Sequence, residues 1–195
     1  MLASSFPAEL SLIHHRDTRL AKLDAAGSPY SALILAKAGL VRLGRGNRIT
    51  SDLAAPTLYH AVSQGALAVE IRSNDTKSRE LCSSLSHWET EWKCLAERAC
   101  LRVLEGGCSV PVGVNSMLEV KEGEEGVLTL TSCVTSLDGG MHVEHTVVEA
   151  VKSKEEAEAV GVKLAKVLFN TGAKAILNDI KEDREKGQRT VSMIA

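Results

Sequence analysis

Leu104-Glu105-Gly106-Gly107-Cys108-Ser109-Val110-Pro111 joins the most strongly patterned helix of the chain to a strand, and it presents one thiol on the turn between them. Residues 89–104 place apolar side chains at helical spacing, with charged residues on the other faces. The two glycines end this helix, because glycine enters left-handed conformations without a Cβ clash. A free cysteine is often buried as a small hydrophobe. The glycine pair and the chain reversal nevertheless favour an exposed, functional Cys108.

The region from about residue 87 onward predicts a self-contained α+β domain. The apolar stripe of its first helix is Trp92, Leu95, Ala96, Ala99 and Val103, and the other faces carry Glu91, Lys93, Glu97, Arg98 and Arg102. Strands with alternating apolar residues are expected near residues 110–120, 126–137 and 142–151, and amphipathic helices at residues 154–169 and 173–184. This order predicts a three-stranded antiparallel sheet with helices packed against it.

The region before residue 87 predicts helices that alternate with strands. Helices are expected at residues 18–27, 38–43 and 73–86. The apolar run at residues 31–36 and the period-2 alternation within residues 62–72 predict strands. Together these elements predict an α/β fragment of a doubly wound domain.

The composition predicts a soluble globular chain. It has 195 residues, of which 44% are hydrophobic, a formal net charge of −2 and only 3% aromatic residues. Without a basic field or stacking platforms, nucleic acid is not an expected partner. No segment approaches the roughly 20 apolar residues of a membrane span, and the N-terminus lacks a signal pattern. A cytoplasmic monomer that does not bind membranes is therefore expected.

The cysteines and histidines predict neither disulfides nor a metal site. The five cysteines include no Cys-x-x-Cys pair, and we expect them to be reduced thiols. His14 and His15 have no third ligand nearby, while His142 and His145 would face opposite sides of a strand. An unrelated thiol enzyme that uses Cys108 in redox chemistry is disfavoured, because no resolving cysteine or activating histidine lies close in sequence.

Five blocks give the chain a resemblance to the porphobilinogen deaminase family, also called hydroxymethylbilane synthases. They occur in the order of that family and at its approximate spacing. The blocks are Thr18–Asp24, Ala38–Gly44, Gln64–Glu70, Ala96–Arg98 and Glu105–Pro111. A Gly-Gly-Cys turn alone would be weak, but the ordered set is specific, and the resemblance runs from about Asp17 to the C-terminus.

The resemblance implies a function and a set of site residues. The complete enzyme of this family condenses four porphobilinogen molecules into hydroxymethylbilane with release of ammonia, in heme and other tetrapyrrole biosynthesis. Its dipyrromethane cofactor is held by a thioether to the cysteine that matches Cys108. Arg19 and Arg42 match cofactor- and substrate-binding arginines, and Gln64 and Gly65 match the hinge beside the site. Arginine suits the acetate and propionate groups of the pyrroles, because its planar fork binds carboxylates bidentately.

The resemblance also implies that part of the family's architecture is absent. We expect a divergent tail at residues 1–16, a partial second domain at 17–65, a hinge strand and helix of the missing first domain at 66–86, and a cofactor-anchoring domain at 87–195. The family's catalytic aspartate lies in the missing domain, so no catalytic residue is assigned on this chain. The chain is therefore expected to be truncated and inactive alone. The alternative is a non-catalytic fragment or interaction module built on the C-terminal α+β domain.

Overall fold

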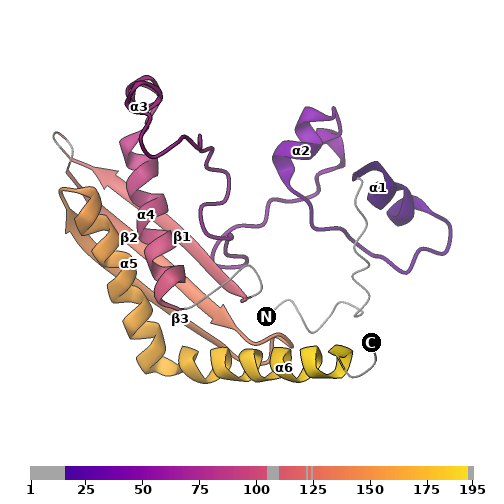
Figure 1. The fold of residues 1–195 in the computed structure, drawn as a ribbon. Coiled ribbons are helices and arrows are strands. Elements are labelled where there is room, and N and C mark those ends of the chain that lie inside the picture. The colour runs from indigo at the N-terminus through magenta and orange to yellow at the C-terminus, as the bar shows by residue number, and fades with distance from the viewer. Residues whose placement is uncertain (1–15, 105–109, 122, 124, 193–195) are drawn as a thin grey trace. The chain divides into compact units, whose positions relative to one another are not determined.

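A computed structural model describes residues 16–104, 110–121, 123 and 125–192 (Figure 1). The chain divides into two units, residues 2–53 and residues 54–195, and each is described by itself. The second unit contains a three-stranded antiparallel sheet of β1 (Val112–Val120), β2 (Gly126–Thr135) and β3 (His142–Val151), in the order β1-β2-β3. The predicted strands and their antiparallel arrangement are therefore confirmed.

Two long helices, α4 (Trp88–Val103) and α5 (Lys154–Leu168), lie side by side against one face of this sheet (Figure 1). The alternation of β2 explains which face they cover, because Leu128, Leu130 and Val134 are buried and belong to the same core as Trp92 and Leu164. Side chains at the intervening positions of β2 point to the opposite face. The helix-covered face thus holds the core of the second unit.

The helix ends in this unit follow from local sequence. The Ser153 hydroxyl caps α5 by accepting a hydrogen bond from the Glu156 N–H at 3.2 Å. After α5, residues 169–173 form a π-helical turn in which Gly172 has φ 119°, a conformation that favours glycine. The helix α6 (Lys174–Ser192) then buries Ile176 and Ile180 in the core. The predicted helices and the break between them at Gly172 are confirmed.

The first unit contains α1 (Arg16–Asp24), α2 (Lys37–Arg42) and the 3-10 turn η2 (Gly46–Arg48). The expected strand at residues 31–36 is wrong, since these residues are irregular and Ile34 is 63% exposed. A buried parallel strand needs hydrogen-bonded neighbours and cover on both faces. No strand of the described part of this unit supplies them.

The expected strand within residues 62–72 is also wrong. The segment is irregular, and Leu67 is 98% exposed. Its alternation is real, but a strand forms only where another strand accepts its backbone hydrogen bonds. The helix that follows, α3 (Thr76–Ser83), is formed as predicted and is capped by Asp75, whose carboxylate accepts a hydrogen bond from the Ser78 N–H at 3.0 Å.

Candidate functional site

A cleft of about 340 Å³ lies beside the edge of β1 and contains two of the predicted site residues. It is formed by three segments, namely residues 60–66, one side of α4 and the middle of β1. Its lining includes Gln64, Gly65, Lys93, Cys94, Glu97 and Asn115. The structure therefore brings Gln64 and Gly65 together with polar groups of α4 and β1.

A buried carboxylate holds the cleft together. Glu97, on α4, is only 8% exposed. Its Oε2 accepts a hydrogen bond from the Ser63 N–H at 2.7 Å, and its Oε1 accepts one from the Ser116 hydroxyl at 2.5 Å. Hydrogen bonds to an ionised acceptor are stronger than neutral ones. Glu97 thus ties the segment before Gln64 to both α4 and β1.

The burial of Glu97 differs from the sequence-based expectation, which placed this residue on a polar face of the helix. Ala96, the preceding residue, and Cys100, one turn further along the helix, are both fully buried. A carboxylate among small residues on a packed helix is a signal that it receives internal donors. The sequence shows the small neighbours of Glu97, but not which groups donate hydrogen bonds to it.

Ser63 has a strained backbone. Its φ is 59°, a left-handed conformation that costs a non-glycine residue about 1–2 kcal/mol. Its hydroxyl oxygen is buried and has no hydrogen-bond partner within the described part of the chain. Gly65, two residues later, has φ 85°. Glycine adopts this left-handed conformation without the strain that Ser63 carries.

We expect Ser63→Gly to stabilise the second unit by about 1 kcal/mol, because glycine removes the left-handed strain and the unpaired buried hydroxyl. Urea unfolding followed by circular dichroism measures the change. Ser84→Gly is the matched control, since Ser84 has helical angles of φ −67° and ψ −17° and glycine there should destabilise. An equal decrease in the free energy of unfolding of both variants would contradict the interpretation that Ser63 is strained.

The predicted arginines lie in the first unit. Arg19 is half-buried on α1 and Arg42 is exposed at the end of α2. Arg48 binds Asp24 through two hydrogen bonds, at 2.6 and 3.0 Å, which join the turn η2 to the end of α1. The hydrogen bond from Arg48 also lowers the pKa of the Asp24 carboxyl. No role of Arg48 was predicted, and the structure shows that it links the turn η2 to the helix that carries Arg19.

The predicted anchor, Cys108, lies outside the described residues. The structure does describe the other cysteines, Cys82, Cys94, Cys100 and Cys133, and all are free thiols. Burial raises the pKa of Cys100 to about 11, and burial is also the main cause of a raised pKa at Cys133. The thiolate is the reactive form of cysteine. These two cysteines are therefore poor nucleophiles.

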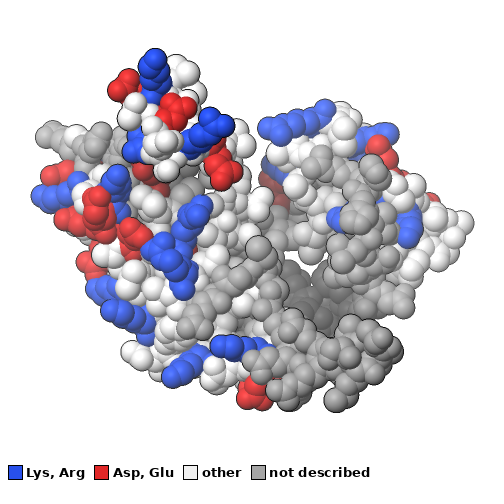
Figure 2. Space-filling model, in the orientation of Figure 1, with Lys and Arg blue, Asp and Glu red and all other residues white. Residues whose placement is uncertain are grey.

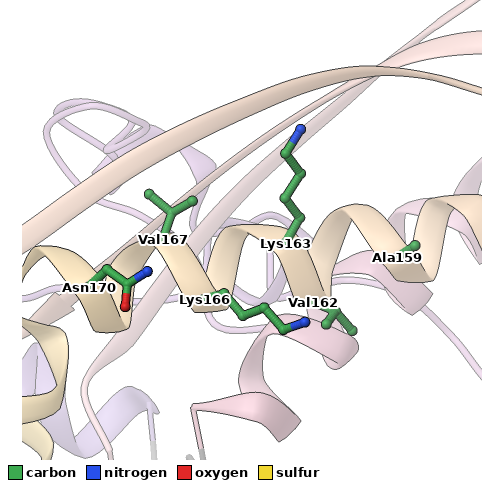
Figure 3. A pocket seen from close by; sticks show the side chains of 6 residues that line it. All are labelled: Ala159, Val162, Lys163, Lys166, Val167 and Asn170. Carbon is green, nitrogen blue, oxygen red and sulfur yellow. The ribbon is translucent and has the colours of Figure 1, made fainter.

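A second depression lies along the outer side of α5 and does not resemble a ligand site. All six residues that line it come from α5 and the turn that follows it (Figure 3). The Lys163 ammonium, which borders it, forms an ion pair with Glu149. A ligand site requires several polar groups that converge from different elements. This depression lacks that convergence among the residues shown.

The charged groups do not mark a further site. On the face drawn in Figure 2, basic and acidic side chains are interspersed over the described parts of the chain.

No three His, Cys, Asp or Glu residues of the described ranges lie close enough together to hold a metal ion. None of the described helices is long and apolar enough to cross a membrane.

Comparison with known proteins assigns the family. Residues 11–80 match the model of the porphobilinogen deaminase dipyromethane cofactor binding domain, and residues 92–170 match that of the porphobilinogen deaminase C-terminal domain. The chain belongs to the porphobilinogen deaminase family.

Several curated relatives are named porphobilinogen deaminase. The protein from Debaryomyces hansenii is 45% identical over 167 residues, which are 86% of this chain and 45% of the relative. The protein from Yarrowia lipolytica is 48% identical over 163 residues, 84% of this chain and 47% of the relative. The protein from Saccharomyces cerevisiae is 45% identical over 170 residues, 87% of this chain and 51% of the relative. The chain spans about half the length of the curated relatives it matches.

Proposed function

We propose that the chain is the cofactor-anchoring C-terminal part of a hydroxymethylbilane synthase, which joins four porphobilinogen molecules and releases ammonia at each step. The observation that carries this proposal is the match of two domains of one family, in order, over residues 11–80 and 92–170. We propose the same domain limits that the sequence suggested: residues 1–16, 17–65, 66–86 and 87–195.

The chain offers residues of the chemistry that a dipyrromethane group needs. Its anchor must be a soft nucleophile. The resemblance assigns this role to Cys108, and burial raises the pKa of Cys100 and Cys133, which disfavours those two thiols. Its acetate and propionate groups need cationic donors. Arg42 is exposed and Arg19 is half-buried, and both are the cationic donors that the resemblance implies. When bound, the cofactor supplies the primer that is extended by porphobilinogen.

Each of the proposed site residues has one role. The Cys108 thiol would hold the cofactor through a thioether to a pyrrolic methylene carbon. Arg19 and Arg42 bind carboxylates and so orient the pyrrole units. Gln64 and Gly65, which line the cleft of the second unit, are assigned to cofactor binding as the resemblance implies. No residue of this chain is assigned as the catalytic acid, so the chain is expected to be inactive alone.

Two segments would complete the doubly wound architecture in a full-length protein. Leu67 and Val69 are exposed by 98% and 68%, and they alternate with polar or small residues as in a strand. Residues 31–36 form the other unpaired apolar run. We infer that both become strands when the part of the relatives that this chain does not cover supplies their hydrogen-bond partners.

The proposed function is tested by joining the chain to the part of the Saccharomyces cerevisiae relative that the chain does not cover. We expect the joined protein to convert porphobilinogen to hydroxymethylbilane and the chain alone to convert none. Steady turnover by the chain alone would contradict the proposal, because a catalytic acid would then lie among its own residues.

In the joined protein, we expect Arg19→Leu and Arg42→Leu each to lower turnover roughly tenfold to a hundredfold, since a charge-assisted hydrogen bond contributes about 1.5–3 kcal/mol. Arg45→Leu removes the same charge from the same unit and should leave turnover unchanged. Initial rates and thermal unfolding are measured together. Unchanged turnover in the Arg19→Leu, Arg42→Leu double variant would exclude the carboxylate-binding role.

A further inference from the structure

Residues 59–63, here called the strap, pair with the edge of β1 and are held from both faces of the sheet. At the edge of the sheet, the His60 N–H donates to the Val114 carbonyl at 3.1 Å, and the Val114 N–H donates to the His60 carbonyl at 2.8 Å. Because β1 is an edge strand, this bridge extends the sheet by one residue. The strap therefore begins as a short addition to β1.

Tyr59 holds the strap on the sheet face that α4 and α5 do not cover. A methyl group at Gly113 would lie 2.5 Å from Tyr59 Cβ and 3.1 Å from Cys133 Sγ, so the tyrosine lies directly over this glycine. Gly113 pairs with Cys133, and Cys133 pairs with Glu144, which makes one row across the sheet. Glu144 lies at the end of that row, and a hydrogen bond between its carboxylate and the Tyr59 hydroxyl contributes to the raised pKa of the tyrosine.

The environment of Tyr59 agrees with this packing. Burial raises its pKa to about 12, and the hydrogen bond to Glu144 acts in the same direction. The phenol is thus neutral at ordinary pH and remains a donor. Gly113 permits the close approach, because any side chain at this position would collide with Tyr59.

The other end of the strap is held from the helix-covered face. There the Ser63 N–H donates to Glu97, which is anchored on α4 and also accepts from Ser116. The chain then turns, with the Ala66 N–H donating to the Ser63 carbonyl at 3.2 Å. This turn contains Gln64 and Gly65, so their position depends on where the strap is held.

We propose that Tyr59, Glu144 and Glu97 are positioning residues that clamp the strap around both sides of the β1 edge and so fix the Gln64–Gly65 turn against α4. The proposal rests on the proposed function, in which this turn borders the cofactor. Its physical consequence does not require the cofactor. Loosening the strap at Tyr59 must open the cleft on the opposite side of the sheet, where Tyr59 itself has no contact.

Two native thiols report on the two sides of the clamp. Cys133 lies beneath Tyr59, and Cys94 lines the cleft beside Gln64. Cys100, in the fully buried core, reports on opening of the whole domain. The rate of alkylation of each thiol by iodoacetamide, measured by peptide mass spectrometry on the full 195-residue chain, therefore separates local from global opening.

We expect Tyr59→Phe to accelerate alkylation of both Cys133 and Cys94 roughly fivefold, the factor that corresponds to a lost hydrogen bond of about 1 kcal/mol, and to leave Cys100 unchanged. Tyr30→Phe is the matched control and should change none of the three rates. Glu144→Ala should reproduce the effect of Tyr59→Phe. Glu144→Gln should largely restore slow alkylation, because its amide oxygen still accepts the tyrosine hydrogen bond.

A faster reaction at Cys133 alone would overturn the proposal, because the two sides would then be independent. An equal acceleration at Cys100 would overturn it as well, since the whole domain would be opening. Glu97→Ala removes the acceptor for the Ser63 N–H and the Ser116 hydroxyl. It tests the clamp from the other side and should accelerate alkylation of Cys133, which Glu97 does not touch. These measurements use no porphobilinogen, so their failure is distinguishable from a failure of the turnover test.

Discussion

Cys108→Ser is expected to reduce turnover of the joined protein to background, while Cys94→Ser and Cys133→Ser retain it. Serine preserves the size of the side chain but replaces the soft thiolate with a hydroxyl, which is a far weaker nucleophile at neutral pH. Without a covalent anchor, no growing chain is retained. The assay is formation of hydroxymethylbilane from porphobilinogen.

The two cysteine controls make this result specific. Cys94 lines the cleft and Cys133 lies beneath Tyr59, so both replacements alter the second unit and leave Cys108 in place. Retained turnover in Cys108→Ser, or its loss in only one of the control variants, would show that the anchor is another residue.

Gly161→Ala is expected to destabilise the second unit by more than about 3 kcal/mol, because its methyl group cannot be accommodated between α4 and α5. A Cβ at this position would lie 1.9 Å from the carbonyl oxygen of Ala96, a backbone atom that cannot rotate away. Helix propensity alone predicts the opposite sign, a gain of about 1 kcal/mol on replacing glycine with alanine. The packing effect is the larger of the two.

The urea midpoint measures this change. Ala159→Gly, at an exposed position of the same helix, is the control and should cost only about 1 kcal/mol of helix propensity. A variant Gly161→Ala that is as stable as the parent chain would contradict the close approach of α4 to α5.

The spacing of apolar residues predicted the helices and strands of the second unit well, because these elements pack against one another in one core. The alternation in β2 and the stripe Val160, Leu164 and Leu168 on α5 face a common core, so periodicity and burial agree. The same reasoning was wrong for residues 31–36 and 62–72. Their apolar patterns are those of strands, but the described residues provide no strand to pair with them.

The candidate site was predicted only in part from sequence. Gln64 and Gly65 do lie in a cleft, whereas the roles of Cys108, Arg19 and Arg42 stay predictions. The buried hydrogen bonds of Glu97 depend on Ser63 and Ser116, which lie 34 and 19 residues away in sequence. Such contacts are set by the tertiary fold, so helical periodicity could not reveal them.

The most direct test of the account is a peptide map of the joined protein after exposure to porphobilinogen. Trypsin should release residues 103–121 as one peptide that contains Cys108. We expect this peptide alone to gain the mass of a dipyrromethane and Cys108→Ser to abolish the gain. An active joined protein with the adduct on another peptide, or with none, would contradict it.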